Sequence, residues 1–356
     1  KKKKKIKKRK IGAVCRFVYD RAMPDDFLNF LVDAFRIRHE ELVPGDKHLN
    51  LEDLRHLPNP NHSIPRIERP IPMKLNRLND KESIFSYVEK KDLLLYYPYH
   101  SFDHFIHFLY EAVHNPETRE IMVTQYRVAE NSAVINTLIA AAQNGKKVTV
   151  FVELKARFDE ENNIVWARML EKAGCHVIYG LVGLKTHSKI TLVVRREEDG
   201  IRRYVHLGTG NYNDATAKLY TDVGMLTCAE RIGEDATAVF NMLSGYSEPL
   251  FWNKLALAPL WLKDKFLHLI EREKNYALEG KNAHIIAKMN SLCDKDIIRA
   301  LYEASAAGVK IELIVRGICC LKVGIPGVSE NISVRSIVGN FLEHSPIFYF
   351  SNDDHY

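Results

Sequence analysis

His187 and Lys189 have side chains, and a spacing, that suit a nucleophile beside a positive charge. They stand two positions apart at the start of an apolar run, and residues two apart share one face of a strand. On one face, a histidine can attack a phosphoryl group while a lysine stabilises its charge. Gly208-Thr209-Gly210-Asn211 follows and offers the backbone N–H groups of a turn and the Asn211 amide. The alternative is a polar strand end beside a turn, and the pair alone does not decide between them.

A second histidine, His344, introduces an apolar strand in the same way, because His344-Ser345 repeats His187-Ser188. The segments upstream also correspond. An offset of 163 residues matches Gly145 to Gly308 and Lys147 to Lys310, with coinciding apolar strand positions. Two α/β units that each bring a histidine to a strand start are more informative than either motif alone.

Three arginines stand at predicted strand ends. Arg127 ends the first strand of its unit, Arg157 follows the second, and Arg316 ends the corresponding strand of the second unit. In open α/β sheets that edge is where ligands bind, and a guanidinium makes bidentate hydrogen bonds to phosphate. Each arginine is alternatively a surface residue paired with a nearby carboxylate. Their convergence on one edge favours a phosphate site.

The elements that must position these residues follow from hydrophobic periodicity and from helix start and stop signals. Strands alternate with helices, which indicates an α/β fold with mixed, mostly parallel sheets flanked by helices. Predicted strands are 93–97, 121–126, 147–154, 176–179, 187–195, 285–290 and 310–315; predicted helices are 102–115, 132–143, 163–173, 259–280 and 294–307.

Composition narrows the function classes. The chain has 356 residues, which predicts two or three domains. Nine of the first ten residues are basic, and the remainder carries 42 basic against 45 acidic residues, so any anion site must be built locally. The six cysteines show no C-x-x-C pair and are interpreted as reduced core thiols of a cytoplasmic protein. The sequence shows no secretory signal, no membrane-spanning run and no P-loop.

Longer sequence motifs make the resemblance to a known family specific. His187-x-Lys189 with Gly208–Asn211, in a duplicated α/β unit, resembles the phospholipase D superfamily, and the longer strings resemble polyphosphate kinase of the first type. Those strings are Tyr126–Ala129, Val152–Glu160, Gly183–Lys189, His206–Asn213, Leu219–Asp222, Lys288–Leu292, Val315–Gly317 and Leu342–His344.

The resemblance implies specific residue roles. The residue matching His187 is phosphorylated by ATP, and the one matching His344 is a second active-site histidine that contacts nucleotide phosphate and serves as an acid. Tyr220 and Arg316 fall at nucleotide contacts. Two further residues, Arg127 and Arg157, fall at a phosphate and magnesium site. Because arginine cannot ligate a cation, we interpret these two as holding phosphates that Mg²⁺ bridges.

The implied partners are ATP or ADP and inorganic polyphosphate, with no nucleic acid. A homo-oligomer and peripheral association with a membrane are also expected. The implied domains are 1–84, the end of a head domain with a proline-rich linker; 85–258, a first phospholipase D-like catalytic domain; and 259–356, a second and incomplete one. An N-terminal helical domain of the family lies outside this sequence.

Two departures from the pattern bear on the alternatives. Val194 stands where the phospholipase D pattern has an acid, as the kinase family allows, which argues against a phosphodiesterase. Pro346 stands where a basic residue is usual, which argues for a protein without catalysis. The alternatives are a phospholipase D-type phosphodiesterase or nuclease, and a non-catalytic polyanion-binding protein. We expect His187 and His344 to face one shared pocket that is lined by arginines and is more basic on the His187 side.

Overall fold

The computed structural model describes residues 14–48, 50, 54, 69–75, 82–128, 132–154, 160–181, 183–245 and 249–355. The chain divides into two compact units, Lys1–Glu68 and Arg69–Tyr356. Most of the predicted proline-rich linker, including Pro58, Pro60 and Pro65, lies outside the described residues. The domain boundaries drawn from the sequence stay predictions.

The first unit contains a small α/β element. Strands β1 (Phe17–Asp20) and β2 (Leu42–Gly45) pair in parallel, and helix α2 (Asp25–Phe35) connects them together with the short 3₁₀ turn η1 (His39–Glu41). Arg36 adopts a left-handed conformation and ends α2.

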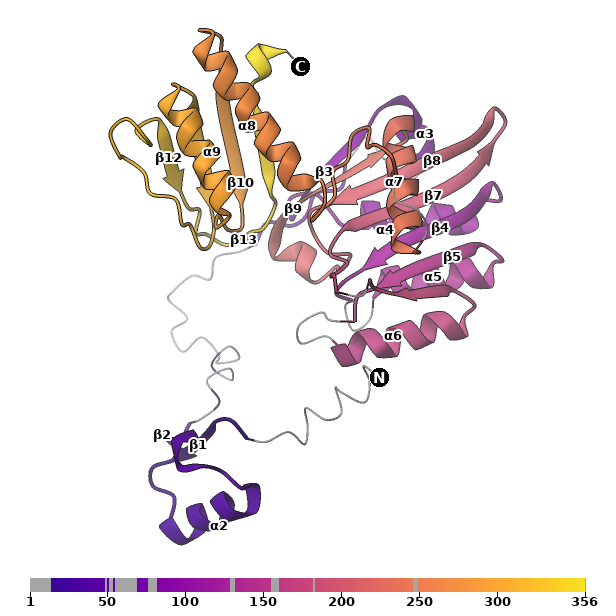
Figure 1. Cartoon of the computed structure of the whole chain (residues 1–356). Coiled ribbons are helices and arrows are strands. Elements are labelled where there is room, and N and C mark those ends of the chain that lie inside the picture. Colours follow the sequence, from indigo (N-terminus) through magenta and orange to yellow (C-terminus); the bar gives the residue numbers. More distant parts are fainter. Residues whose placement is uncertain are drawn as a thin grey trace. The chain divides into compact units, whose positions relative to one another are not determined.

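The second unit holds the larger sheet (Figure 1), which runs in the order β13-β9-β8-β7-β4-β5-β6, with β3 also paired to β9. Its strands are β3 (Leu93–Tyr97), β4 (Thr118–Gln125), β5 (Lys147–Val152), β6 (His176–Tyr179), β7 (Lys189–Glu197), β8 (Gly200–Gly208), β9 (Tyr220–Thr227) and β13 (Leu342–Glu343). Its helical segments are α3 (Ile84–Lys90), α4 (Asp103–His114), α5 (Ala133–Gln143), α6 (Glu160–Lys172), η3 (Thr216–Lys218) and α7 (Glu230–Leu243).

Side-chain alternation gives this sheet two buried faces. On strand β5, Val150 and Val152 belong to the core under helices α3 to α6, whereas Phe151 belongs to the core under α7. Strand β7 divides in the same way, because Val193 faces the first core and Leu192 the second. A sheet covered on both faces explains why its strands are nearly continuous apolar runs.

A four-stranded sheet follows, in the order β12-β11-β10-β14. Its elements are α8 (Leu262–Leu278), β10 (His284–Met289), α9 (Lys295–Ala306), β11 (Lys310–Val315), β12 (Ile332–Arg335), β14 (Ile347–Phe350) and the turn η4 (Asn352–Asp354). The segment β10–α9–β11 repeats β4–α5–β5. In both copies a glycine with positive φ, Gly145 at 77° and Gly308 at 102°, ends the helix and leads into the second strand.

The predicted fold class, mixed sheets flanked by helices, is confirmed, but the mostly parallel character holds only for the smaller sheet. Among the described strands of the larger sheet, four pairings are antiparallel and three are parallel. The tight β7–β8 hairpin accounts for part of the difference, because a two-residue turn can join only antiparallel strands. The helix predicted from Pro259 begins later, at Leu262.

One short strand links the two sheets. Strand β13 lies between β12 and β14 in the sequence, yet it leaves their sheet and pairs in parallel with β9, Leu342 opposite Tyr220 and Glu343 opposite Thr221. Backbone bonds extend the contact, since Ser345 N donates to Thr221 O at 2.9 Å.

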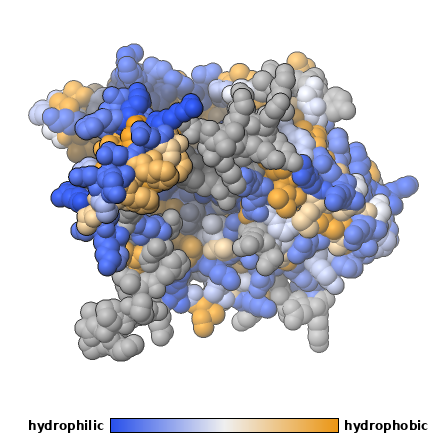
Figure 2. Space-filling view, turned by 90° about the horizontal axis from the view of Figure 1, so that it is seen from below, coloured by the Kyte–Doolittle hydropathy of each residue, from blue (hydrophilic) through white to orange (hydrophobic). Residues whose placement is uncertain are grey.

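The surface in Figure 2 is largely hydrophilic, with scattered apolar patches. No helix among the described residues is long and apolar enough to cross a membrane.

Asp235 fixes the segment that leads from α7 toward α8. Its buried carboxylate accepts backbone N–H groups from Asn253 at 2.9 Å, Lys254 at 2.7 Å and Leu255 at 2.8 Å. Asp235→Ala should therefore lower the free energy of unfolding by roughly 2–3 kcal/mol, measured by urea denaturation. Glu234→Ala is the matched control, because the hydrogen bond that Glu234 accepts from the Asn253 amide is exposed. Equal losses in both variants would contradict this assignment.

Candidate active site

His187 sits on a loop that is fixed from both sides. Before it, Thr186 N donates to the buried carboxylate of Glu153 at 2.8 Å. After it, the Thr124 hydroxyl donates to Ser188 O at 2.7 Å. Strands β4 and β5 thus hold the chain as it enters β7. His187 itself remains reachable by solvent.

Lys189 and Tyr126 surround the His187 imidazole. The Lys189 ammonium lies 3.1 Å from each ring nitrogen and donates to His187 O at 2.7 Å. The Tyr126 ring meets the imidazole edge-on, with centroids 4.5 Å apart. Lys189 is itself buried. As the sequence predicts, histidine and lysine lie together.

The electrostatic setting makes His187 a neutral base. Partial burial lowers the pKa of His187 to about 4, and the positive charges of Lys189, His344, Lys185 and Arg127 act in the same direction. Burial also lowers the pKa of Lys189 to about 8, with Arg127 contributing and Asp222 opposing. At neutral pH the imidazole therefore keeps an available lone pair beside several cations.

His344 reaches this setting from the second sheet. It follows β13 directly, and its Nδ1 donates to the buried Asp222 carboxylate at 2.7 Å. Its ring lies 5.5 Å from that of Tyr220, centroid to centroid. Since Nδ1 holds the hydrogen toward Asp222, Nε2 is the nitrogen left for a ligand. His344 is also among the groups that lower the pKa of His187.

Neighbouring contacts hold Glu343, which precedes His344. Glu343 accepts from Lys288 Nζ at 2.6 Å and from the Thr221 hydroxyl at 3.1 Å. Lys288 Nζ also donates to the Ser345 hydroxyl at 2.9 Å. Carboxylates of Asp222 and Glu343 thus lie beside His344 together with Lys288, whereas Lys189, Lys185 and Arg127 act on His187. One shared pocket that is more basic on the His187 side stays a prediction.

The Gly208–Asn211 turn packs against Asp222. The Thr209 hydroxyl donates to Asp222 Oδ1 at 2.7 Å. A Cβ at Gly210 would lie 2.4 Å from Asp222 Oδ2, so this approach requires glycine. Asn211 Oδ1 is buried, with no hydrogen-bond partner among the described residues.

The three arginines are placed differently. Arg127 acts electrostatically on both His187 and Lys189. Arg316 is held by Asn290, whose Oδ1 accepts from its Nε at 3.1 Å and from its Nη2 at 2.9 Å. Arg157 lies outside the described residues. The structure thus brings Arg127 to His187 and leaves the convergence of all three arginines a prediction.

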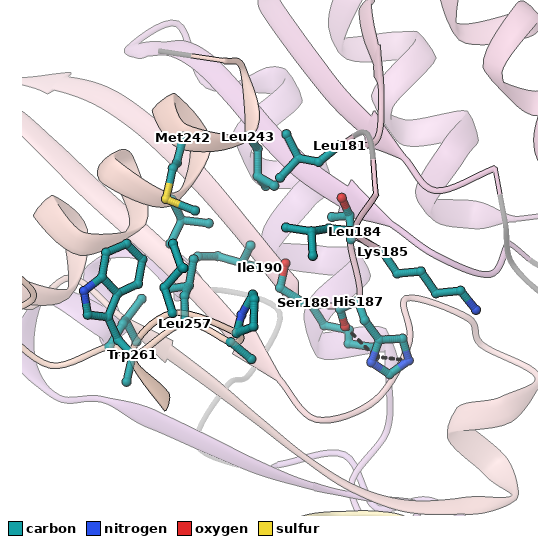
Figure 3. A pocket seen from close by; sticks show the side chains of 18 of the residues that line it. Leu181, Leu184, Lys185, His187, Ser188, Ile190, Met242, Leu243, Leu257 and Trp261 are labelled. Atoms are coloured by element: carbon teal, nitrogen blue, oxygen red, sulfur yellow. Dashed lines mark hydrogen bonds between the residues drawn. The ribbon is translucent and has the colours of Figure 1, made fainter. Parts of the chain in front are cut away.

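A cavity of about 610 Å³ opens beside His187 (Figure 3). Its polar rim is the segment Lys185–Lys189, and in the view Leu181, Leu257 and Trp261 stand around the apolar interior, away from the His187 ring. A polyanion has no partners in such an interior, so a phosphate chain would have to bind at the polar rim.

Several positioning residues escaped the sequence reasoning. Asp222 appeared only within a longer motif, yet it holds His344. Glu153 and Thr124 fix the His187 loop, and the buried Asn163 amide donates to Tyr126 O at 2.8 Å and to Glu153 O at 2.9 Å. The signal available for Thr124, Glu153 and Asp222 was a polar residue within or beside an apolar run. Asn163 follows charged and polar residues and offers no such signal.

The described residues contain no group of three or more His, Cys, Asp or Glu side chains that could hold a metal ion. Magnesium does not require one, because it is commonly bound through one or two carboxylates, water and substrate phosphates. A magnesium ion held by substrate phosphates and water is therefore compatible with the described residues.

Fold and site together define an α/β protein in which positive charges act on His187 and a buried carboxylate holds His344. Three family models match it: the polyphosphate kinase middle domain at residues 1–57, C-terminal domain 1 at 83–249 and C-terminal domain 2 at 255–356. The chain belongs to the polyphosphate kinase family.

Individual relatives agree. The chain is 53% identical over 359 residues to a polyphosphate kinase of Halalkalibacterium halodurans, covering 98% of this chain and 50% of that protein. It is 45% identical over 374 residues to one of Thermosynechococcus vestitus, covering 98% and 51%. The crystal structure of polyphosphate kinase from Porphyromonas gingivalis superposes with a TM-score of 0.78 at 40% identity, covering 95% and 54%. The chain thus spans about half the length of the relatives it matches.

The electrostatic account predicts the titration of His187. Its imidazole should titrate near pH 4 in nitrogen-resolved NMR, and Lys189→Gln should raise that pKa toward 6.5, because the strongest neighbouring positive charge is removed. Lys185→Gln removes an equal but less influential charge and should shift the pKa less. A titration near pH 6.5 in the unmodified protein would contradict the assignment.

Proposed function

We propose that this chain is the catalytic part of an enzyme that transfers the γ-phosphate of ATP reversibly to polyphosphate through a phosphohistidine at His187. The observation that carries the proposal is a histidine with its pKa lowered to about 4 that nevertheless lies among cations. Such a group is a nucleophile at neutral pH, and its surroundings favour an anionic phosphoryl group. Membership of the polyphosphate kinase family supports the substrate class.

In the first step, a His187 ring nitrogen attacks the γ-phosphorus. An N–P bond forms, the bond between the γ-phosphorus and the β,γ-bridging oxygen breaks, and ADP leaves with that oxygen. The transition state spreads negative charge over the equatorial oxygens. Lys189, 3.1 Å from the ring, and Arg127 supply fixed positive charge to these oxygens without reorganisation.

In the second step, a terminal oxygen of polyphosphate attacks the phosphohistidine, and His187 departs as neutral imidazole. A phosphoramidate is high in energy, so the same intermediate can return its phosphate to ADP. His344 is fixed through Nδ1 by Asp222, which leaves Nε2 for the substrate. We assign to this nitrogen the donation of a proton or hydrogen bond in the first step, to the β,γ-bridging oxygen that departs with ADP.

We assign the substrate contacts from the sequence motifs and the family resemblance. Tyr220 and Arg316 bind the nucleotide, and Asn211 binds phosphate. Arg127 and Arg157 hold phosphates, and a Mg²⁺ ion carried by those phosphates would supply further positive charge at the transferring group. We retain the homo-oligomer and peripheral membrane association as expectations of the family resemblance.

His187→Gln should abolish acid-labile, alkali-stable labelling of the protein by γ-labelled ATP, together with polymer synthesis. The matched control is Ser188→Ala, which changes the next residue but keeps the carbonyl that binds Thr124. Labelling should be measured on the full-length protein, and the phosphorylated residue should be located by mass spectrometry at neutral pH. Undiminished labelling of the His187→Gln variant would overturn the proposal.

Arg127→Ala should reduce the labelling rate roughly 10²–10³-fold, because one preorganised charge contact is typically worth about 2.7–4 kcal/mol in the transition state. Arg119→Ala, an exposed arginine on the same strand β4, should leave the rate unchanged. Single-turnover kinetics measure both. If Arg127→Ala kept more than about half of the rate, Arg127 would have no part in transfer.

A further inference from the structure

Two loops that follow β10 and β11 run side by side beyond the sheet. Leu292 pairs in parallel with Cys319. Two backbone bonds fix this register, because Leu292 N donates to Ile318 O at 2.9 Å and Cys320 N donates to Leu292 O at 2.8 Å. The next residues in each loop, Cys293 and Cys320, are consequently opposite each other.

Alternation puts these two cysteines on the outer face. Leu292 belongs to the core of the second sheet, and Cys319 packs against that core. Successive side chains of extended chains point to opposite faces. Cys293 and Cys320 therefore share the opposite face, and both are exposed.

The distance between the two paired loops suits a disulfide bond between Cys293 and Cys320. Neighbouring paired strands lie about 4.8 Å apart, and the Cα atoms of a disulfide are usually about 4.4–6.8 Å apart. The same proximity shows in the electrostatics, because the Cys320 side chain is the largest cause that raises the pKa of Cys293.

We propose that Cys293 and Cys320 form a reversible intramolecular disulfide, a modification site outside the proposed transfer chemistry. The oxidant is a small-molecule disulfide. One cysteine thiolate attacks it and forms a mixed disulfide, releasing one small thiol. The second cysteine thiolate then attacks the protein sulfur, forms the Cys293–Cys320 bond and releases the other small thiol. Two protein thiols are oxidised and one small disulfide is reduced to two thiols.

The bond would join the two loops that hold Arg316. Asn290, three residues before Cys293, accepts both guanidinium hydrogen bonds, and Gly317 N donates to Asn290 O at 2.8 Å. The disulfide would therefore connect the redox state of the thiols to the loops around Arg316.

The test is incubation of the native full-length protein with oxidised glutathione, followed by digestion under non-reducing acidic conditions and mass spectrometry. The expected result is a Cys293–Cys320 cross-linked peptide without bound glutathione. Cys15, an exposed cysteine in the first unit, serves as the internal control for reagent access and should retain glutathione. The cross-link should disappear on treatment with dithiothreitol.

Two variants sharpen the test. Cys320→Ser should leave glutathione trapped on Cys293, whereas Cys319→Ser should form the same cross-link as the native protein. A Cys293–Cys319 bond, stable glutathione on both Cys293 and Cys320, or two unmodified thiols while Cys15 reacts would each overturn the proposal. The mapping does not depend on phosphoryl transfer, so it distinguishes failure here from failure of the proposed function.

Discussion

The pairing of β13 with β9 is the contact on which the site depends. Two strand residues, Leu342 and Glu343, leave the second sheet and add to the edge of the first. His344 follows directly and donates to Asp222, a residue of β9 itself. One short parallel pairing therefore sets both the position of the second histidine and the ring nitrogen that it presents. Side-chain hydrogen bonds stabilise this pairing, because Glu343 accepts from both Thr221 and Lys288.

The second constraint is electrostatic. A histidine among cations would ordinarily attract anions but contribute little as a nucleophile if it were itself protonated. Here burial and the same cations lower the pKa of His187 to about 4, so the ring stays neutral while the surroundings stay positive. An arriving phosphate would meet both a lone pair and a positive field. The lowered pKa of Lys189, about 8, still leaves its ammonium charged at neutral pH.

The sequence predicted the helices and strands better than the way in which the strands pair and the residues of the site come together. The β4–α5–β5 and β10–α9–β11 repeats were readable because helix-ending glycines and apolar runs are local signals. The antiparallel majority of the larger sheet was not, since pairing partners are set by long-range packing. Likewise His187 and Lys189 were found by spacing, whereas Asp222 and Glu153 act through contacts across 122 and 33 residues of chain, which no local pattern reveals.

The central claim is that Asp222 and His344 act as one unit at the His187 site. The most direct measurement is a double-mutant cycle on the rate of His187 phosphorylation in the full-length protein, with Asp222→Asn, His344→Gln and the combined variant. The account predicts that the combined variant loses clearly less rate than the product of the two single losses, because Asp222 acts in part through His344. Losses that multiply would show that the two residues act independently and would contradict the account.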